Sequence, residues 1–209
     1  SGNNVKILLD GIPLIDRGAT KQSLSQLDVN SIERVEIVEG PMSVVYGTDA
    51  LAGVINIITK KGDGYSEENT WRVGARVQEE SMGKEYDFFK DKGLHNESID
   101  LGFNHKSGLF VNGGYTRNNH GGWQGDLTGR EKRWHPKDQA LMNGMFGFQN
   151  RNMNVWYRLD FLDEKIFGPN NGSELQPEKV SDKDFLTKRY THQLQSDWKL
   201  DNRLDVHAA

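Results

Sequence analysis

From residue 70 onward apolar and polar residues alternate with a period of two, and this pattern constrains the fold more than any other feature. Successive side chains of a β-strand point to opposite faces of a sheet, so the pattern predicts strands with one apolar face. The clearest segment, residues 152–162, sets Met153, Val155, Tyr157, Leu159 and Phe161 on one face and Asn154, Trp156, Arg158 and Asp160 on the other. The other segments are residues 71–77, 98–106, 109–116, 140–150, 190–200 and 204–208. We therefore expect about seven antiparallel strands.

The connections between these segments alternate strictly between short and long. Three tight turns are expected at residues 106–108, 150–152 and 201–203. Three long polar loops are expected at residues 79–97, 117–137 and 163–188. Outer-membrane β-barrels have short periplasmic turns, long extracellular loops and one apolar face toward lipid. Aromatic residues near the strand ends fit an interfacial girdle: Trp71, Tyr115, Tyr190 and Trp198. A soluble β-sandwich remains the alternative at this point, because a two-faced antiparallel sheet also alternates.

The first 61 residues have a different texture, in which short strands alternate with short helical pieces. Strands are expected at residues 5–9, 34–38 and 53–59, with loop at residues 12–26. Ser31–Glu33 can start a helical turn, and Pro41 followed by Gly47 predicts a short helix over residues 42–46. The run KKGDG, residues 60–64, is a natural boundary. We therefore expect a small α+β domain at residues 1–64 and a strand domain at residues 65–209.

The composition excludes several function classes. The 209 residues include no cysteine, which removes disulfides and thiolate metal sites. A formal net charge of −4 argues against a nucleic-acid-binding protein. None of the hydrolase, zinc-protease, phosphate-loop or EF-hand motifs occurs. We therefore expect no enzyme, no cofactor and no resident metal.

One stretch carries a specific resemblance. SIERVEIVEGPMSVVYGTDALAGVINIITKK, residues 31–61, resembles the C-terminal half of the plug domain of TonB-dependent outer-membrane receptors. The earlier ILLDGIPL, residues 7–14, matches another plug segment with its Asp-Gly turn. The positions that carry the motif are Asp10, Gly11, Glu39, Gly40, Pro41, Tyr46, Gly47 and Gly53. Glu39 departs from the family, in which an arginine is common before Gly-Pro.

The resemblance implies the fold and the function of a receptor. It predicts a β-rich chain with a small α+β part, in which part of a plug precedes the first strands of an outer-membrane barrel. The family has twenty-two strands and an N-terminal TonB box, so we expect this chain to be a fragment that starts within an element. The implied partners are the TonB energy-transducing complex, outer-membrane lipid and a scarce nutrient, either ferric siderophore, haem or cobalamin. The alternatives are a surface-binding or adhesion barrel without transport, and a soluble β-rich enzyme.

Two loops are expected to contact the ligand. Asp16 and Arg17 lie in the loop at residues 12–26, where the family's plug apex meets its ligand. His120, Trp123, Trp134 and His135 lie in the long loop at residues 117–137. Three basic residues of that loop could grip an anionic siderophore or lipopolysaccharide: Arg130, Lys132 and Arg133. The plainer interpretation is a solvated loop. A separate hypothesis pairs Glu39 with a cation of the barrel interior, either Arg72, Arg76 or Arg158.

Overall fold

The computed structural model describes residues 5–14, 26–40, 53–61, 68–127, 129–169, 182–201 and 204–208. The chain divides into two compact units, Ser1–Lys61 and Gly62–Ala209. The helix expected at residues 42–46 lies outside the described residues, as do Asp16, Arg17, Pro41, Tyr46 and Gly47.

The first unit is built on a four-stranded sheet of order β2-β1-β4-β3. Its strands are β1 (Val5–Leu9), β2 (Ile12–Pro13), β3 (Ile32–Glu39) and β4 (Gly53–Thr59). β1 runs parallel to β4, while β2 and β3 are antiparallel to their neighbours. Leu8, Val54 and Ile57 form its buried core. The sequence predicted these strands except β2, which continues β1 through the tight turn at Asp10-Gly11.

A 3₁₀ turn, Val29–Ser31, precedes β3. The helical turn expected at Ser31–Glu33 therefore lies two residues earlier in the chain. The Asp28 side chain caps this turn by accepting a hydrogen bond from the Asn30 amide at 3.0 Å. The strand then starts at Ile32, two residues earlier than expected. The reason is that Ile32 already pairs with Thr59 of β4.

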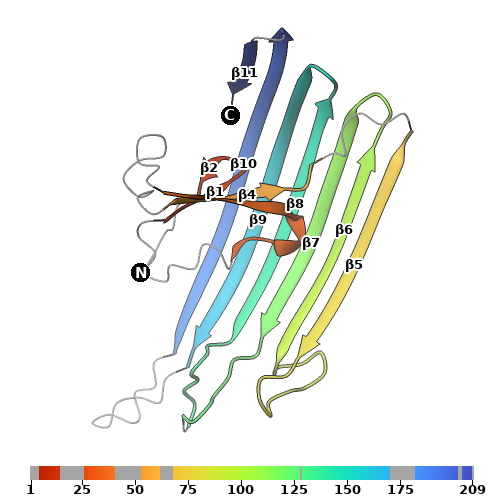
Figure 1. Cartoon of the computed structure of the whole chain (residues 1–209). Coiled ribbons are helices and arrows are strands. Elements are labelled where there is room, and N and C mark those ends of the chain that lie inside the picture. The colour runs from red at the N-terminus through yellow and green to blue at the C-terminus, as the bar shows by residue number, and fades with distance from the viewer. Residues whose placement is uncertain are drawn as a thin grey trace. The chain divides into compact units, whose positions relative to one another are not determined.

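The second unit is a seven-stranded antiparallel sheet in which each strand pairs with the next along the chain (Figure 1). The strands are β5 (Thr70–Glu80), β6 (Leu94–Asn104), β7 (Leu109–His120), β8 (Lys137–Gln149), β9 (Met153–Gly168), β10 (Lys183–Asp201) and β11 (Leu204–Ala208). The expected β-rich fold, a small first unit followed by about seven antiparallel strands, is confirmed. Among the described residues, no helix is long and apolar enough to cross a membrane.

The predicted faces are also observed, because the alternating apolar positions pair with one another across the sheet. Val73 pairs with Leu101, Val111 with Phe146, and Phe161 with Tyr190. We call the surface that carries these side chains the apolar face, and the opposite surface the polar face. Several large side chains of the apolar face are exposed: Trp71, Val73, Ile99, Leu101, Val111, Phe146, Tyr190 and Leu194. An exposed apolar sheet of this size is typical of a lipid-facing surface.

The long loops are shorter than expected, because the strands continue past the point where the apolar alternation stops. The loop between β5 and β6 spans residues 81–93, and that between β7 and β8 spans residues 121–136. Polar cross-strand pairs extend the ladder in each case, for example Glu79 with His95 and Asn118 with Gln139. His120, expected in a loop, is therefore the last residue of β7.

The expected tight turns are present at both places that the structure describes. In the turn between β6 and β7, Gly108 has a φ of +97°, and a Cβ there would lie 2.0 Å from the Gln149 carbonyl oxygen. In the turn between β8 and β9, the Asn150 side chain accepts hydrogen bonds from the amides of Asn152 and Met153, both at 2.8 Å. Short turns at this end place all the long loops at the other end of the sheet.

Candidate ligand-binding site

The loop between β7 and β8 folds into a small hairpin held by two tryptophans. The Trp123 amide donates to the Trp134 carbonyl at 2.9 Å, and the Trp134 amide donates back at 3.0 Å. Their rings lie 5.4 Å apart between centroids, and Trp134 is about half exposed at 50%. The backbone pair fixes both rings at the loop end of the sheet, where a ligand can stack on them.

His120 joins this pair from the end of β7. Its ring centroid lies 6.0 Å from that of Trp134, and its Nδ1 accepts a hydrogen bond from the Gly122 amide at 2.8 Å. Because Nδ1 is the acceptor, the neutral ring carries its proton on Nε2. In this state Nε2 is a hydrogen-bond donor and has no lone pair to offer a metal.

Of the four residues predicted in this loop, the structure brings three together: His120, Trp123 and Trp134. His135 instead lies against β9, where a Cβ at Gly168 would be 3.4 Å from its Cε1 atom. The neighbouring Pro136 carbonyl accepts a hydrogen bond from the Phe167 amide at 2.9 Å. His135 therefore belongs to the packing of β9 in the described contacts.

The three basic residues of the loop are all engaged by other groups. Arg130 pairs with Asp182 at 2.7 Å, and Arg133 pairs with Asp126 at 2.5 Å. Lys132 donates to the Gly121 carbonyl at 3.4 Å. The hydrogen bond from Arg133 lowers the pKa of Asp126 below its ordinary value. These cations are used to shape the loop, which weakens the interpretation of a basic patch that grips a bare anion.

A buried polar network on the polar face lies next to this site, and sequence reasoning missed it. Asn118 donates to Gln139 at 2.9 Å, Gln139 donates to Glu164 at 2.8 Å, and Lys137 pairs with Glu164 at 3.2 Å. Lys137 is also the register partner of His120. Gln139 and Glu164 are 1% and 2% exposed. The period of two could have revealed Glu164, which continues the polar phase of β9 beyond Leu162, but that segment was expected to be loop.

Two plug-motif residues of the first unit, Asp10 and Gly11, form a second constellation with Thr59 and Lys61. The Asp10 carboxylate accepts hydrogen bonds from the Thr59 amide at 3.0 Å and the Thr59 hydroxyl at 2.6 Å. Lys61 lies 3.6 Å from the same carboxylate, whose side chain is fully buried. Asp10 and Gly11 have φ values of +49° and +83°. The Asp-Gly pair is therefore a left-handed turn that clamps the end of β4.

Gly53 and Glu39 face each other across β3 and β4. Gly53 has a φ of +148°, and a Cβ there would lie 2.5 Å from the Val38 carbonyl oxygen, so the position needs glycine. Gly40 has a φ of +111°, which favours glycine through the backbone conformation alone, because a Cβ there would meet nothing within 4 Å. The arginines proposed as partners of Glu39 all have polar partners within the second unit. Arg158 donates to Asp160 at 2.7 Å, and Arg76 donates to Gln78 at 2.6 Å. Arg72 lies 3.4 Å from Asn112. The pairing of Glu39 stays a prediction.

Comparisons with known proteins agree with this architecture. Residues 1–54 match the family model described as TonB-dependent Receptor Plug Domain. The vitamin B12 transporter BtuB of Vibrio vulnificus is 41% identical over 75 residues, which is 36% of this chain and 12% of that relative. The chain therefore spans only a small part of the length of this relative.

Solved structures share the fold over almost the whole chain. The copper transporter OprC matches with a TM-score of 0.72 and 13% identity over 99% of this chain and 29% of its own. The siderophore receptor PirA of Acinetobacter baumannii matches with a TM-score of 0.61 and 18% identity over 94% of this chain and 30% of its own.

The resemblance to TonB-dependent receptors is thus confirmed, and with it the expected location in the outer membrane. The matches are to transporters and receptors, as expected for a chain that is not an enzyme.

Proposed function

We propose that this chain is part of a receptor that captures a scarce, bulky nutrient at the cell surface and imports it with energy delivered through TonB. The plug match over residues 1–54 and the similarity to a vitamin B12 transporter support this proposal. The alternatives of an adhesion protein and a soluble enzyme gain no support from the matches.

The observation that carries the choice of ligand is the cluster of His120, Trp123 and Trp134. An exposed indole offers a flat apolar surface, and a histidine with its proton on Nε2 offers a hydrogen-bond donor beside it. This combination suits a large planar ligand that carries carbonyl or amide oxygens at its rim. It does not suit a bare metal ion, which needs lone pairs. Cobalamin is our first candidate and a ferric siderophore the second.

The test is uptake of labelled cobalamin, haem and ferric siderophore, each supplied in parallel to cells that produce the full-length protein. We expect uptake of one ligand, lost when TonB is deleted. Uptake of none of the three would contradict the nutrient proposal.

The role of the cluster is tested by Trp134→Ala, which removes the exposed ring. Stacking on an aromatic side chain contributes about 1 kcal/mol, so affinity for the transported ligand should fall about fivefold to tenfold. Trp71→Ala is the matched control, because Trp71 is a large exposed aromatic of the apolar face. Equal ligand affinity in the two variants would show that the hairpin is not part of the binding site.

A further inference from the structure

The apolar face of the second unit ends in a belt of charged residues on the long-loop side. Toward the long loops, β5 to β10 carry charged side chains on this same face. Three ion pairs cross between neighbouring strands: Arg117–Asp138 at 3.4 Å, Lys165–Asp184 at 2.8 Å and Lys188–Asp163 at 3.4 Å. With Glu97, the register partner of Arg117, these residues make up what we call the charged rim. In an outer-membrane protein, such a rim lies at the level of the lipid headgroups.

The loop at residues 81–93 folds over one end of this rim and is fastened there. Glu79 Oε2 lies 2.6 Å from His95 Nδ1, and it accepts hydrogen bonds from the Tyr86 hydroxyl at 3.3 Å and the Phe89 amide at 3.4 Å. The other ring nitrogen of His95 lies 3.1 Å from the Lys92 carbonyl oxygen. His95 is 4% exposed. The loop is thus held against the apolar side of the sheet rather than extended into solvent.

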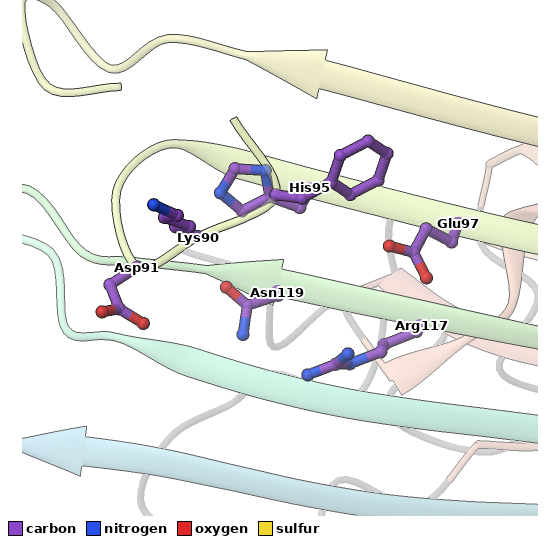
Figure 2. Close-up of a pocket in the computed structure, with 7 residues that line it drawn as sticks. Lys90, Asp91, His95, Glu97, Arg117 and Asn119 are labelled. Carbon is purple, nitrogen blue, oxygen red and sulfur yellow. The ribbon is translucent and has the colours of Figure 1, made fainter. Parts of the chain in front are cut away.

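Loop and rim together line an open pocket with a volume of about 110 Å³, which we call the cavity. Figure 2 shows its walls: the loop contributes Lys90 and Asp91, β6 contributes His95 and Glu97, and β7 contributes Arg117 and Asn119. Phe89 completes the lining. Lys90 makes no ion pair with the residues that the structure describes, and Arg117 shares its charge with Asp138. The cavity therefore offers two cations, two carboxylates and an amide within one small space.

Aromatic residues beside the cavity give it an apolar border. Phe88 and Phe89 pack edge to face with ring centroids 4.5 Å apart, and they are 65% and 49% exposed. Two exposed phenylalanines next to cations form an amphipathic surface, which is typical of a protein segment at a membrane interface. Below them the exposed apolar face continues through Ile99 and Leu101 of β6.

We propose that this surface binds a phosphorylated glycolipid of the outer leaflet. The phosphate lies between Lys90 and Arg117, because charge-assisted hydrogen bonds to phosphate are strong. Sugar hydroxyls donate hydrogen bonds to the carboxylates of Asp91 and Glu97. These carboxylates would repel a phosphate ion that carries no sugar. The acyl chains lie along the apolar face. Glu79 and His95 act as positioning residues, since they fix the loop that supplies Lys90. The proposal rests on the outer-membrane location and not on nutrient transport.

The test measures binding of lipid A, a phosphorylated and acylated glucosamine disaccharide, to the full-length protein in detergent free of that lipid. The variant Lys90→Gln/Arg117→Gln should bind lipid A about thirtyfold more weakly, because each of the two basic residues near a lipid surface contributes about 1 kcal/mol. The matched control is Arg76→Gln/Lys199→Gln, which removes the same charge from the polar face. Dephosphorylated lipid A should bind the unaltered protein weakly, and inorganic phosphate should not compete.

Unchanged affinity in Lys90→Gln/Arg117→Gln would overturn the proposal, as would an equal loss in the control variant. Effective competition by inorganic phosphate would overturn the lipid and leave a simple anion site. Nutrient uptake is measured separately on the same variants. A loss of lipid binding with normal uptake supports this site whatever the transported ligand is.

Discussion

Glu79 and His95 are direct register partners in β5 and β6, and their side chains meet at 2.6 Å. Each ring nitrogen of His95 has an oxygen within hydrogen-bond distance, from Glu79 on one side and Lys92 on the other. A ring nitrogen that donates to the Glu79 carboxylate makes a hydrogen bond to a charged acceptor. The pair therefore fastens the loop at residues 81–93 through a charge-assisted contact.

The variant Glu79→Gln removes the charge from this contact and should loosen the loop. A hydrogen bond to a charged group contributes about 1.5 kcal/mol or more, so exchange of the Phe89 amide should become about tenfold faster. Hydrogen exchange measured by mass spectrometry tests this, with the adjacent Glu80→Gln as the control. Unaltered exchange throughout residues 81–93 in Glu79→Gln would show that the pair does not hold the loop.

The hairpin of Trp123 and Trp134 should loosen in acid. The hydrogen bond from Arg133 holds the pKa of Asp126 below its ordinary value, so the folded loop favours the ionised carboxylate. The stabilisation is present above the ordinary pKa of an aspartate and is lost as the pH falls through the lowered one. Tryptophan fluorescence followed from neutral pH to about pH 2 should show this loss, and Asp126→Asn should shift it or abolish it. The same acid transition in Asp126→Asn would assign it to another group.

Gly147 of β8 makes room for an aromatic cluster on the polar face. Phe110, Met145 and Trp156 form a buried group, and a Cβ at Gly147 would lie 2.6 Å from the Phe110 ring and 2.7 Å from Trp156 Cβ. Gly147→Ala should therefore destabilise the sheet by about 1–3 kcal/mol through overpacking. Urea unfolding of the full-length protein in detergent measures this change.

Gly144 is the matched control for that substitution, because it lies in the same strand and a Cβ there would meet nothing within 4 Å. Gly144→Ala should unfold at the urea concentration of the unaltered protein. Equal stability of the two variants would mean that the cluster adapts to the added methyl group.

Asp10 should be the residue of the first unit that is most sensitive to truncation. Asp10→Ala leaves the buried Thr59 amide and hydroxyl without their acceptor, at a cost of about 1–3 kcal/mol. It also places alanine at a φ of +49°, which asparagine tolerates better. Hydrogen exchange at the Thr59 amide should therefore rise most in Asp10→Ala and less in Asp10→Asn. Slow exchange in both variants would contradict the clamp.

The strands and their faces could be predicted because they depend on local pattern. The alternation of Met153 to Phe161 has a period of two, which only an extended strand can use to bury or expose one face. The ends of the strands could not be predicted in the same way. Lys165 and Asp184 extend β9 and β10 through an ion pair, and this pair exists only because the register brings two distant polar residues together.

The candidate site was predictable only in part. Two tryptophans and two histidines in one polar segment drew attention to residues 117–137, and three of the four do lie together. His135 lies apart from the other three residues because it packs against β9. The fastening of the loop by Glu79 and His95 left no local signal, because the two residues are sixteen positions apart and each looks like an ordinary polar residue.

The sequence by itself determined the seven or so strands of the second unit, their apolar face, and the plug motif with its Asp10-Gly11 turn. These features follow from side-chain period and backbone stereochemistry, which act over a few residues. Only the tertiary structure decided that Glu79 meets His95, that Gln139 meets Glu164, and that a charged cavity borders the apolar face. Those contacts come from strand register, which places residues far apart in the chain at hydrogen-bond distance across the sheet.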